Sequence, residues 1–285
     1  MAELINGKEI SAAVKQRIAA EVKTLKANGI VPGLAVIIVG NDPASQVYVG
    51  SKERACNELG MYSEKYELPE STDEETLLAL IDELNKKDSI HGILCQLPLP
   101  RHINEKAVID AIDPGKDVDA FHIANVGKIM IGDFDFLPCT PAGIMEMLKY
   151  KGIDPAGKHC VVIGRSNIVG KPMAMLMLHA NATVTICHSK TQNLKELCRQ
   201  ADILVAAVGK ARFVTPDMVK PGAIVIDVGM NRPDGKLCGD VDFDAVEPIC
   251  SAITPVPGGV GPMTITMLMK NTLKAACIQN NINIE

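Results

Sequence analysis

The sequence predicts an α/β protein of two domains, each built on a parallel β-sheet with helices on its faces. Short apolar runs alternate with amphipathic segments along the chain, and a polar, turn-rich stretch at 113–138 separates them into two series. The length of 285 residues also favours two domains of ordinary size. We place the boundary near Pro138 and Cys139. The first domain then comprises residues 1–138, completed by about 267–285, and the second comprises residues 139–266.

The first series of apolar runs predicts three strands connected by helices. Apolar residues at helical spacing between Lys8 and Lys26 indicate an amphipathic helix, which Asn28 and Gly29 bring to an end. The same reasoning along the chain predicts strands at 34–39, 61–68 and 90–97, and further helices at 45–59 and 73–85.

The second series predicts a doubly wound, Rossmann-like sheet, because its five apolar runs match the number of parallel strands that such a nucleotide-binding domain requires. Helices are expected to begin at Pro141 and after Pro172. A last helix at 263–278 is expected to pack back on the first domain. The five predicted strands lie at 159–164, 183–188, 203–209, 223–229 and 252–256.

Composition and charge exclude several classes of function. The net charge is −5 and the basic residues are dispersed, so the chain lacks the basic stripe that nucleic-acid binding needs. The N-terminus does not resemble a signal peptide and no apolar run reaches membrane-spanning length, which predicts a cytosolic protein without membrane contact. The nine cysteines show no CxxC pair and the six histidines no HExxH motif, so we expect reduced thiols and no metal site.

The segment from Cys160 to Pro172 indicates a nucleotide site. Gly164 ends a predicted strand and Gly170 begins a predicted helix, where glycine lets the backbone approach a pyrophosphate and free N–H groups attract its charge. The pattern differs from GxGxxG, because Ser166 replaces the middle glycine and the loop is one residue longer. Taken alone, the two glycines are equally consistent with a tight turn.

The end of the next predicted strand favours NADP over NAD. Enzymes that use NAD usually carry an acidic residue there, whereas this chain has His188, Ser189 and Lys190. A basic, hydroxyl-rich segment suits the 2′-phosphate of NADP, and Arg165 supplies a second cation for the same group.

Candidate catalytic side chains occur in the first half. Tyr48 and Lys52 are four residues apart on a predicted helix, so both emerge on one face and can act on one ligand. Gln96 lies at the carboxyl end of a predicted parallel strand, the usual position of a ligand crevice. Each residue also has a structural interpretation: a solvated surface lysine, a packed tyrosine and a core glutamine.

Two loops are further candidates. Asp117 and Asp119 place two carboxylates in the polar stretch, although exposed acids in loops usually cap turns. The segment 255–262 locks three glycines between three prolines, which gives a rigid loop with close access to the backbone at the end of the fifth strand.

With these motifs in place, the sequence resembles the bifunctional methylenetetrahydrofolate dehydrogenase/cyclohydrolase family of one-carbon metabolism. The resemblance covers nearly the whole chain and rests on six motifs in order. They are NDPASQVYVGSK at 41–52, GILCQLPLP at 92–100, KDVD at 116–119, PCTP at 138–141, GRSNIVG at 164–170 and PGGVGP at 257–262.

The resemblance implies that 5,10-methylenetetrahydrofolate is oxidised with NADP to the methenyl cation, which water opens to 10-formyltetrahydrofolate. It also implies a cytoplasmic homodimer and a place in tetrahydrofolate interconversion and purine biosynthesis. Lys52 would be the catalytic lysine, Tyr48 would lie along the folate, Gln96 would tune the lysine and Asp119 would hold the pterin. The substrate site would also include Cys95, Leu97, Pro257, Gly258, Gly259, Val260 and Gly261. NADP would be held by Gly164, Arg165, Ser166, Ser189 and the backbone near Met230.

Three residues depart from the family pattern: Ile123 where proline is frequent, Lys190 where arginine is frequent, and Cys95 where an aliphatic residue is common. Only Lys190 bears on function, because an ammonium in place of a bidentate guanidinium relaxes the preference for NADP.

Two alternatives remain open: an NADP-linked dehydrogenase of hydroxy or amino acids, and a non-catalytic nucleotide-binding regulator. For a lysine to work near neutral pH, burial or neighbouring groups must lower its pKa.

Overall fold

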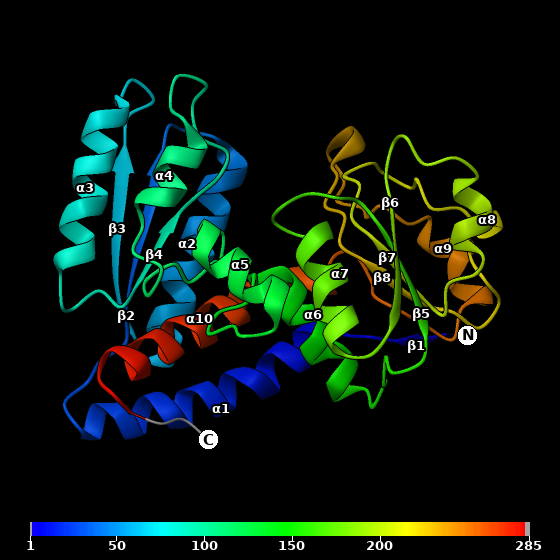
Figure 1. Cartoon of the computed structure of the whole chain (residues 1–285), viewed down its shortest axis with the longest axis horizontal. Helices are drawn as coiled ribbons and strands as arrows, with labels where there is room; N and C mark the ends of the chain where they lie inside the picture. The colour runs from blue at the N-terminus through cyan, green and yellow to red at the C-terminus, as the bar shows by residue number, and fades with distance from the viewer. Residues whose placement is uncertain (1, 283–285) are drawn as a thin grey trace. The chain divides into compact units, whose positions relative to one another are not determined.

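The computed structural model describes residues 2–282, except for the side chains of residues 43–45, 47, 48 and 234. The chain forms two compact units (Figure 1). One unit comprises Ala13–Cys139 with Ile265–Glu285, and we call it the catalytic unit because it contains the candidate catalytic residues. The other comprises Met1–Ala12 with Thr140–Thr264, and we call it the nucleotide unit.

The catalytic unit contains a three-stranded parallel sheet in the order β3-β2-β4, as the first series of apolar runs predicts. All seven residues of the central strand β2 are buried, so this strand is covered on both faces. Its strands are β2 (Gly33–Val39), β3 (Tyr62–Leu68) and β4 (Gly92–Cys95). Its helices include α2 (Pro43–Leu59), α3 (Glu74–Lys86), α4 (Glu105–Ala111), α5 (Ile123–Ile131) and most of α1 (Gly7–Ala27).

Helix α3 illustrates how the sequence determines local structure in this unit. The Asp73 side chain accepts a hydrogen bond from the backbone N–H of Thr76 at 2.7 Å and so caps the helix start. Leu77, Ile81 and Leu84 follow at helical spacing and are fully buried against the sheet core.

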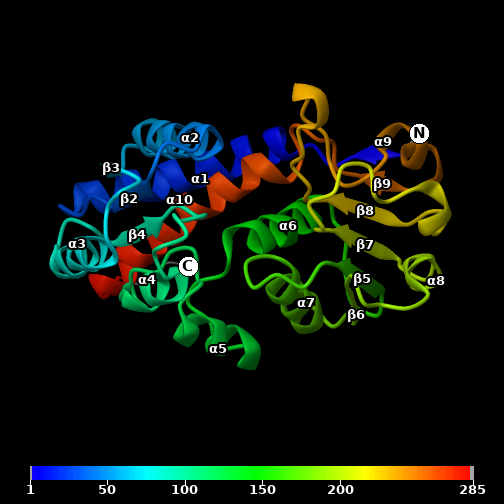
Figure 2. The same ribbon diagram turned by 90° about the horizontal axis from the view of Figure 1, so that it is seen from above.

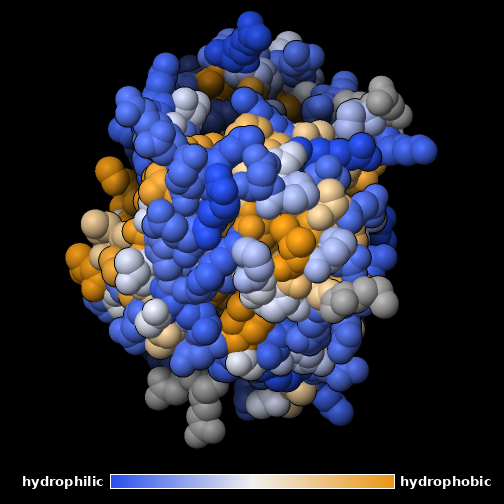
Figure 3. All heavy atoms as spheres, turned by 90° about the vertical axis from the view of Figure 1, so that its right-hand side faces the viewer, coloured by the Kyte–Doolittle hydropathy of each residue, from blue (hydrophilic) through white to orange (hydrophobic). Residues whose placement is uncertain are grey.

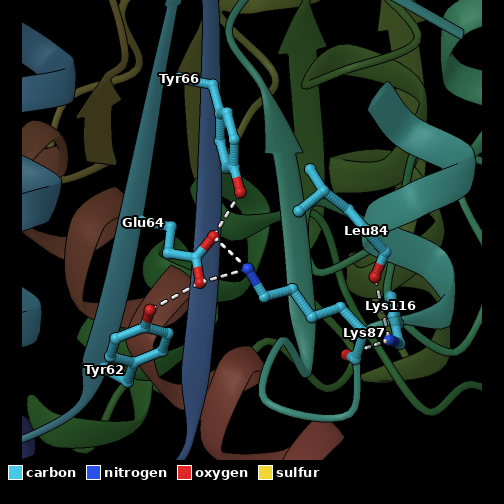
Figure 4. Close-up of polar contacts among 6 residues, drawn as sticks. All are labelled: Tyr62, Glu64, Tyr66, Leu84, Lys87 and Lys116. Carbon is cyan, nitrogen blue, oxygen red and sulfur yellow. Dashed lines mark hydrogen bonds and ion pairs between the residues drawn. The ribbon is translucent and has the colours of Figure 1, made fainter. Parts of the chain in front are cut away.

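Two lysines near the end of α3 differ in their surroundings (Figure 4). The ammonium of Lys87 lies 2.7 Å from the Glu64 carboxylate, which also accepts hydrogen bonds from the hydroxyls of Tyr62 and Tyr66 on β3. Lys116 is buried, and its ammonium donates to the carbonyls of Leu84 at 3.1 Å and Lys87 at 2.9 Å. Burial lowers the pKa of Lys116, and its ammonium adds a second donor to two carbonyls at the C-terminal end of α3 that also accept from the backbone N–H groups of Lys87 and Ile90.

The nucleotide unit contains a six-stranded parallel sheet in the order β1-β9-β8-β7-β5-β6. All five predicted strands are present, in the doubly wound order, and α7 (Gly170–His179) and α8 (Leu194–Cys198) lie on opposite faces of the sheet (Figure 2). The strands are β1 (Glu3–Leu4), β5 (His159–Ile163), β6 (Thr183–Cys187), β7 (Ile203–Ala206), β8 (Ile224–Asp227) and β9 (Ala252–Ile253). The remaining helices are α6 (Cys139–Tyr150) and α9 (Phe243–Val246), with short 3-10 turns at Pro216–Met218, Pro233–Gly235 and Glu247–Ile249.

Strand β1 was not predicted from the sequence; it pairs with β9 through Glu3 and Ala252 and through Leu4 and Ile253. Residues 3 and 4 therefore belong to the sheet of the second half, although the predicted first domain begins at residue 1. The strand has only two residues and gains its structure from pairing with β9, so no periodicity in the sequence reveals it.

The last helix, α10 (Val260–Gln279), contributes residues after 264 to the catalytic unit, as predicted. There the Sγ of Cys56 lies 3.5 Å from the Sδ of Met269, and Gln279 donates to the backbone carbonyl of His91 at 2.9 Å.

Within residues 2–282, no helix is long and apolar enough to cross a membrane. The face in Figure 3 is mainly polar, with apolar side chains in small, separate groups.

Replacing Lys116 with Met should lower the free energy of unfolding by about 2 kcal/mol, because two carbonyls lose a charged donor. The matched control is Lys87→Met, which breaks an ion pair whose lysine side chain is 36% exposed and should cost less than about 1 kcal/mol. Urea unfolding of both variants measures the difference. Equal losses would contradict a capping role for Lys116.

Candidate active site and nucleotide-binding site

Lys52 and Gln96 form a direct contact in the catalytic unit. Lys52 is on α2, only 8% exposed, and its Nζ donates to the Oε1 of Gln96 at 2.7 Å. Gln96 follows β4, where its backbone N–H donates to Ile37 at 2.8 Å and its Nε2 donates to the carbonyl of Leu97 at 2.8 Å. These bonds fix the amide so that its oxygen is directed at the lysine.

The electrostatic environment of Lys52 favours its neutral form. Burial lowers the pKa of Lys52, and the charges of Asp119 and Cys139 oppose that change without cancelling it. Burial also favours the neutral form of Asp119 and so raises the pKa of its carboxyl group, whereas the charge of Lys52 lowers that pKa. A primary amine whose pKa is lowered, next to a carboxylate, can accept and return a proton under mild conditions.

The two acids of the 116–122 loop have different environments. Asp117 is 2% exposed and accepts hydrogen bonds from the Asn125 amide and the His122 backbone N–H, each at 2.8 Å. It therefore stabilises the loop, and the interpretation of both acids as exposed turn caps is wrong for Asp117. Asp119 is half-buried and interacts with Lys52.

Cys139 is a member of this group that the sequence analysis treated only as a buried thiol. It is 3% exposed, and its thiol interacts with the carboxylate of Asp119. Burial and the Asp119 charge raise the pKa of the Cys139 thiol, so this group is a neutral donor and not a nucleophile. No spacing in the sequence pairs residue 139 with residues 52 and 119, because they converge only in the fold.

Three other predicted substrate residues lie in the catalytic unit. Cys95 and Leu97 flank Gln96 and are half-buried, and burial raises the pKa of Cys95 to about 12. The backbone of Tyr48 is in α2, one helical turn before Lys52, but its side chain lies outside the described residues.

In the nucleotide unit, the backbone packs closely at the predicted glycine turn. Gly164 has φ +131°, and a Cβ atom there would lie 2.3 Å from the carbonyl oxygen of Ala207. Ser166 accepts hydrogen bonds from the N–H groups of Val169 and Gly170, both at 3.2 Å, and thereby shapes the start of α7. This turn leaves no room for a side chain at residue 164 and presents backbone at a helix start, which fits a bound pyrophosphate.

The basic residues predicted to select NADP lie on neighbouring strand ends. Ile163 pairs with Cys187, so the segments that follow β5 and β6 are adjacent. Arg165 follows the first strand and Ser189 and Lys190 follow the second; all three are exposed. Met230, after β8, is 46% exposed. The structure thus brings the cations and Ser189 to one edge of the sheet, the position that a 2′-phosphate requires.

A buried carboxylate that the sequence analysis missed organises the same edge. Asp240 is fully buried and accepts hydrogen bonds from the backbone N–H groups of Val208, Gly209 and Lys210 at 2.6–2.9 Å. Its own N–H donates to Asp227, and burial raises the pKa of Asp227 to about 6. Asp240 therefore holds the loop after β7 in place without itself being exposed to a ligand.

The glycine-rich loop at 255–262 packs against the start of α1. The backbone N–H of Lys8 donates to the carbonyl of Gly258 at 3.2 Å. A Cβ atom on Gly7 would lie 1.8 Å from the carbonyl oxygen of Gly259, so the two segments are in close backbone contact. In the described residues, no group of three or more histidine, cysteine or acidic side chains could hold a metal ion.

Comparisons with known proteins agree on one family. Residues 5–119 match the model described as "Tetrahydrofolate dehydrogenase/cyclohydrolase, catalytic domain", and residues 138–280 match its "NAD(P)-binding domain" counterpart. The "Bifunctional protein FolD" of Acetivibrio thermocellus is 63% identical over 279 residues, which covers 98% of both chains.

Solved structures agree with this assignment. The bifunctional enzyme FolD, methylenetetrahydrofolate dehydrogenase/cyclohydrolase, from Campylobacter jejuni has a TM-score of 0.96 at 51% identity, covering 99% of this chain and 100% of that one. The Trypanosoma brucei enzyme, complexed with NADP cofactor and an inhibitor, has a TM-score of 0.94 at 38% identity, covering 98% of each chain.

The close packing at Gly164 leads to a prediction. Gly164→Ala should destabilise the protein by about 3 kcal/mol and weaken dinucleotide binding, because the added methyl group clashes with Ala207. Gly222→Ala is the control: it has φ +82° and no atom near the added Cβ, so its cost should be about 1 kcal/mol. Thermal unfolding and NADP titration of both variants test this, and unchanged NADP binding by Gly164→Ala would contradict the assignment.

Proposed function

Since the chain belongs to the tetrahydrofolate dehydrogenase/cyclohydrolase family, we propose that it oxidises 5,10-methylenetetrahydrofolate with NADP and then hydrolyses the methenyl product to 10-formyltetrahydrofolate. The observation that carries the proposal is the buried amine of Lys52, held by Gln96 and next to Asp119. This arrangement supplies a proton acceptor at the site, as the hydrolysis requires.

The oxidation needs geometry more than acid–base chemistry. NADP, when bound, accepts a hydride from the methylene carbon of the folate. The product cation is delocalised over two nitrogens, so the protein has only to hold the folate in the reacting orientation. For the cofactor we propose contacts from Gly164, Arg165, Ser166, Ser189 and Met230, and Lys190 as a point charge near the 2′-phosphate.

The hydrolysis needs a group that moves a proton. Water adds to the methenyl carbon while the neutral amine of Lys52 takes one proton from it, which leaves a hydroxyl on that carbon. The bond from carbon to N5 then breaks, the hydroxyl oxygen becomes the carbonyl of the formyl group on N10, and the hydroxyl proton is transferred to N5. Gln96 accepts a hydrogen bond from the amine and directs it. The carboxylate of Asp119 binds the pterin and compensates the charge of the lysine once it is protonated.

The remaining proposals rest on the family resemblance. They place Tyr48 along the folate and assign further folate contacts to Cys95, Leu97, Pro257, Gly258, Gly259, Val260 and Gly261. They also include a homodimer, a cytoplasmic location and a supply of formyl groups for purine biosynthesis.

The first test is a paired assay of the wild type and Lys52→Ala with 5,10-methylenetetrahydrofolate and NADP. NADPH and the methenyl chromophore are followed together. The wild type should form NADPH and clear the methenyl intermediate, whereas the variant should clear it about 100-fold more slowly or worse. Lys15→Ala is the control, because Lys15 forms a surface ion pair with Glu58 and should leave both activities unchanged. A wild type that forms no NADPH, with NAD also tried, would overturn the proposal in favour of a dehydrogenase with another substrate.

The lowered pKa of Lys52 predicts the pH dependence of the hydrolysis. As pH rises, the lysine loses its proton and the active neutral form accumulates, so the rate should rise along a limb with its midpoint below the ordinary lysine value of 10.5. Lys52→Arg should abolish this limb, because arginine does not deprotonate in this range. The measurement is the rate of methenyl hydrolysis as a function of pH. A wild-type limb that persists in Lys52→Arg would assign it to another group.

A further inference from the structure

Two irregular segments carry residues to the lysine of the catalytic unit. One contains Val118 and Asp119 and turns through Ala120, a non-glycine residue with φ 58°. The other contains Leu137 and leads to Cys139 at the start of α6. The first segment is paired with the sheet at Asp117, which forms a bridge with Ile93 of β4, and this pairing does not extend to Asp119. Strand pairing therefore does not by itself fix the position of Asp119 relative to Lys52.

One amide on α10 donates hydrogen bonds to both segments. The Nδ2 of Asn271 donates to the carbonyl of Val118 at 2.8 Å and to the carbonyl of Leu137 at 2.9 Å, which uses both hydrogens of that nitrogen. It also lies 3.7 Å from the Sγ of Cys139. One acceptor directly precedes Asp119 and the other lies two residues before Cys139.

The surroundings of Asn271 make these bonds matter. The residue is 8% exposed, so water replaces the amide poorly if it is removed. The Cys139 thiol donates to the same Val118 carbonyl at 3.5 Å and also interacts with Asp119. The amide, the thiol and the carboxylate therefore form one connected polar network next to the lysine.

We infer that Asn271 is a positioning residue of the active site: it touches neither folate nor cofactor, but its amide holds the segment that carries Asp119 against the segment that carries Cys139. The inference rests on the proposed function of Lys52 and Asp119. If the amide is removed, both segments lose their hydrogen bonds to α10, and the Asp119 carboxylate is held less firmly beside Lys52. Both its contact with the folate and its electrostatic effect on the lysine then change.

The test compares Asn271→Leu with Thr272→Val. Leucine matches asparagine in size and fills the space but removes both donors. Thr272 is the next residue of α10 and is also buried, and within the described part of the chain its hydroxyl donates only to the Leu268 carbonyl of the same helix, at 2.9 Å. Both variants therefore alter one buried polar group of the same helix, but only the first removes the hydrogen bonds from the helix to the two segments.

For Asn271→Leu, kcat/KM for 5,10-methylenetetrahydrofolate should fall about 10- to 100-fold, mainly through KM. The midpoint of the hydrolysis pH profile should move, because the described titratable groups that act on Lys52 are Asp119 and Cys139. The Kd for NADP should stay unchanged, and Thr272→Val should resemble the wild type in all three measurements. A merely structural role would instead lower thermal stability and reduce both activities in equal proportion, without moving the pH profile.

Asn271→Ser is the second variant, in case the leucine variant does not fold. Its single hydroxyl can donate to only one carbonyl. Its KM should therefore exceed that of the wild type, but by less than removal of both donors would raise it. Wild-type KM and pH profile in a folded Asn271→Leu, or in Asn271→Ser if that alone folds, would overturn the inference. An inactive wild type would instead overturn the proposed function, so the two failures are distinguishable.

Discussion

The catalytic unit places an amine where water has little access, and most of its local structure follows from that constraint. Taking an ammonium out of water is costly, so a buried lysine must be partnered, neutral or both. Lys52 is partnered by Gln96, and burial lowers its pKa in the direction of the neutral form. Asp119 limits how far that pKa falls. The balance of burial against one carboxylate therefore controls the protonation of the lysine, which makes the placement of that carboxylate the critical geometric quantity.

The nucleotide unit solves a different problem, because its ligand carries the charge. Here the requirement is close backbone approach, which Gly164 allows, and Ser166 fixes the start of α7 by accepting hydrogen bonds from the N–H groups of Val169 and Gly170. The buried Asp240 stabilises the neighbouring loop through backbone N–H groups. The cations remain exposed at the strand ends, so their charge is available to a phosphate.

The sequence allowed the prediction of features that depend on local patterns. The five strands of the nucleotide unit, the helix that carries Lys52 and the glycine turn at 164 follow from periodicity and turn chemistry. It did not allow the prediction of β1, Asp240 or Asn271, because each gains its role from partners more than 100 residues away or from the backbone of another loop. Lys52 shows the boundary between the two cases. Its spacing from Tyr48 suggested a site, but its burial and its contact with Gln96 became visible only in the fold.

Asp117 and Asp119 lie in one short loop but have different roles: Asp117 stabilises the loop, and Asp119 interacts with the catalytic lysine. Both are acids two residues apart, yet Asp117 directs its carboxylate to the Asn125 amide and a backbone N–H, while Asp119 interacts with Lys52 and Cys139. A carboxylate that is fully occupied by fixed donors makes a firm anchor, and one that faces a titrating amine responds to the state of that amine. The carbonyl of Val118, directly before Asp119, accepts from Asn271, and the N–H of His122, after Asp119, donates to Asp117, so the loop is anchored on both sides of Asp119. The loop can therefore stay rigid while its one functional carboxylate remains available.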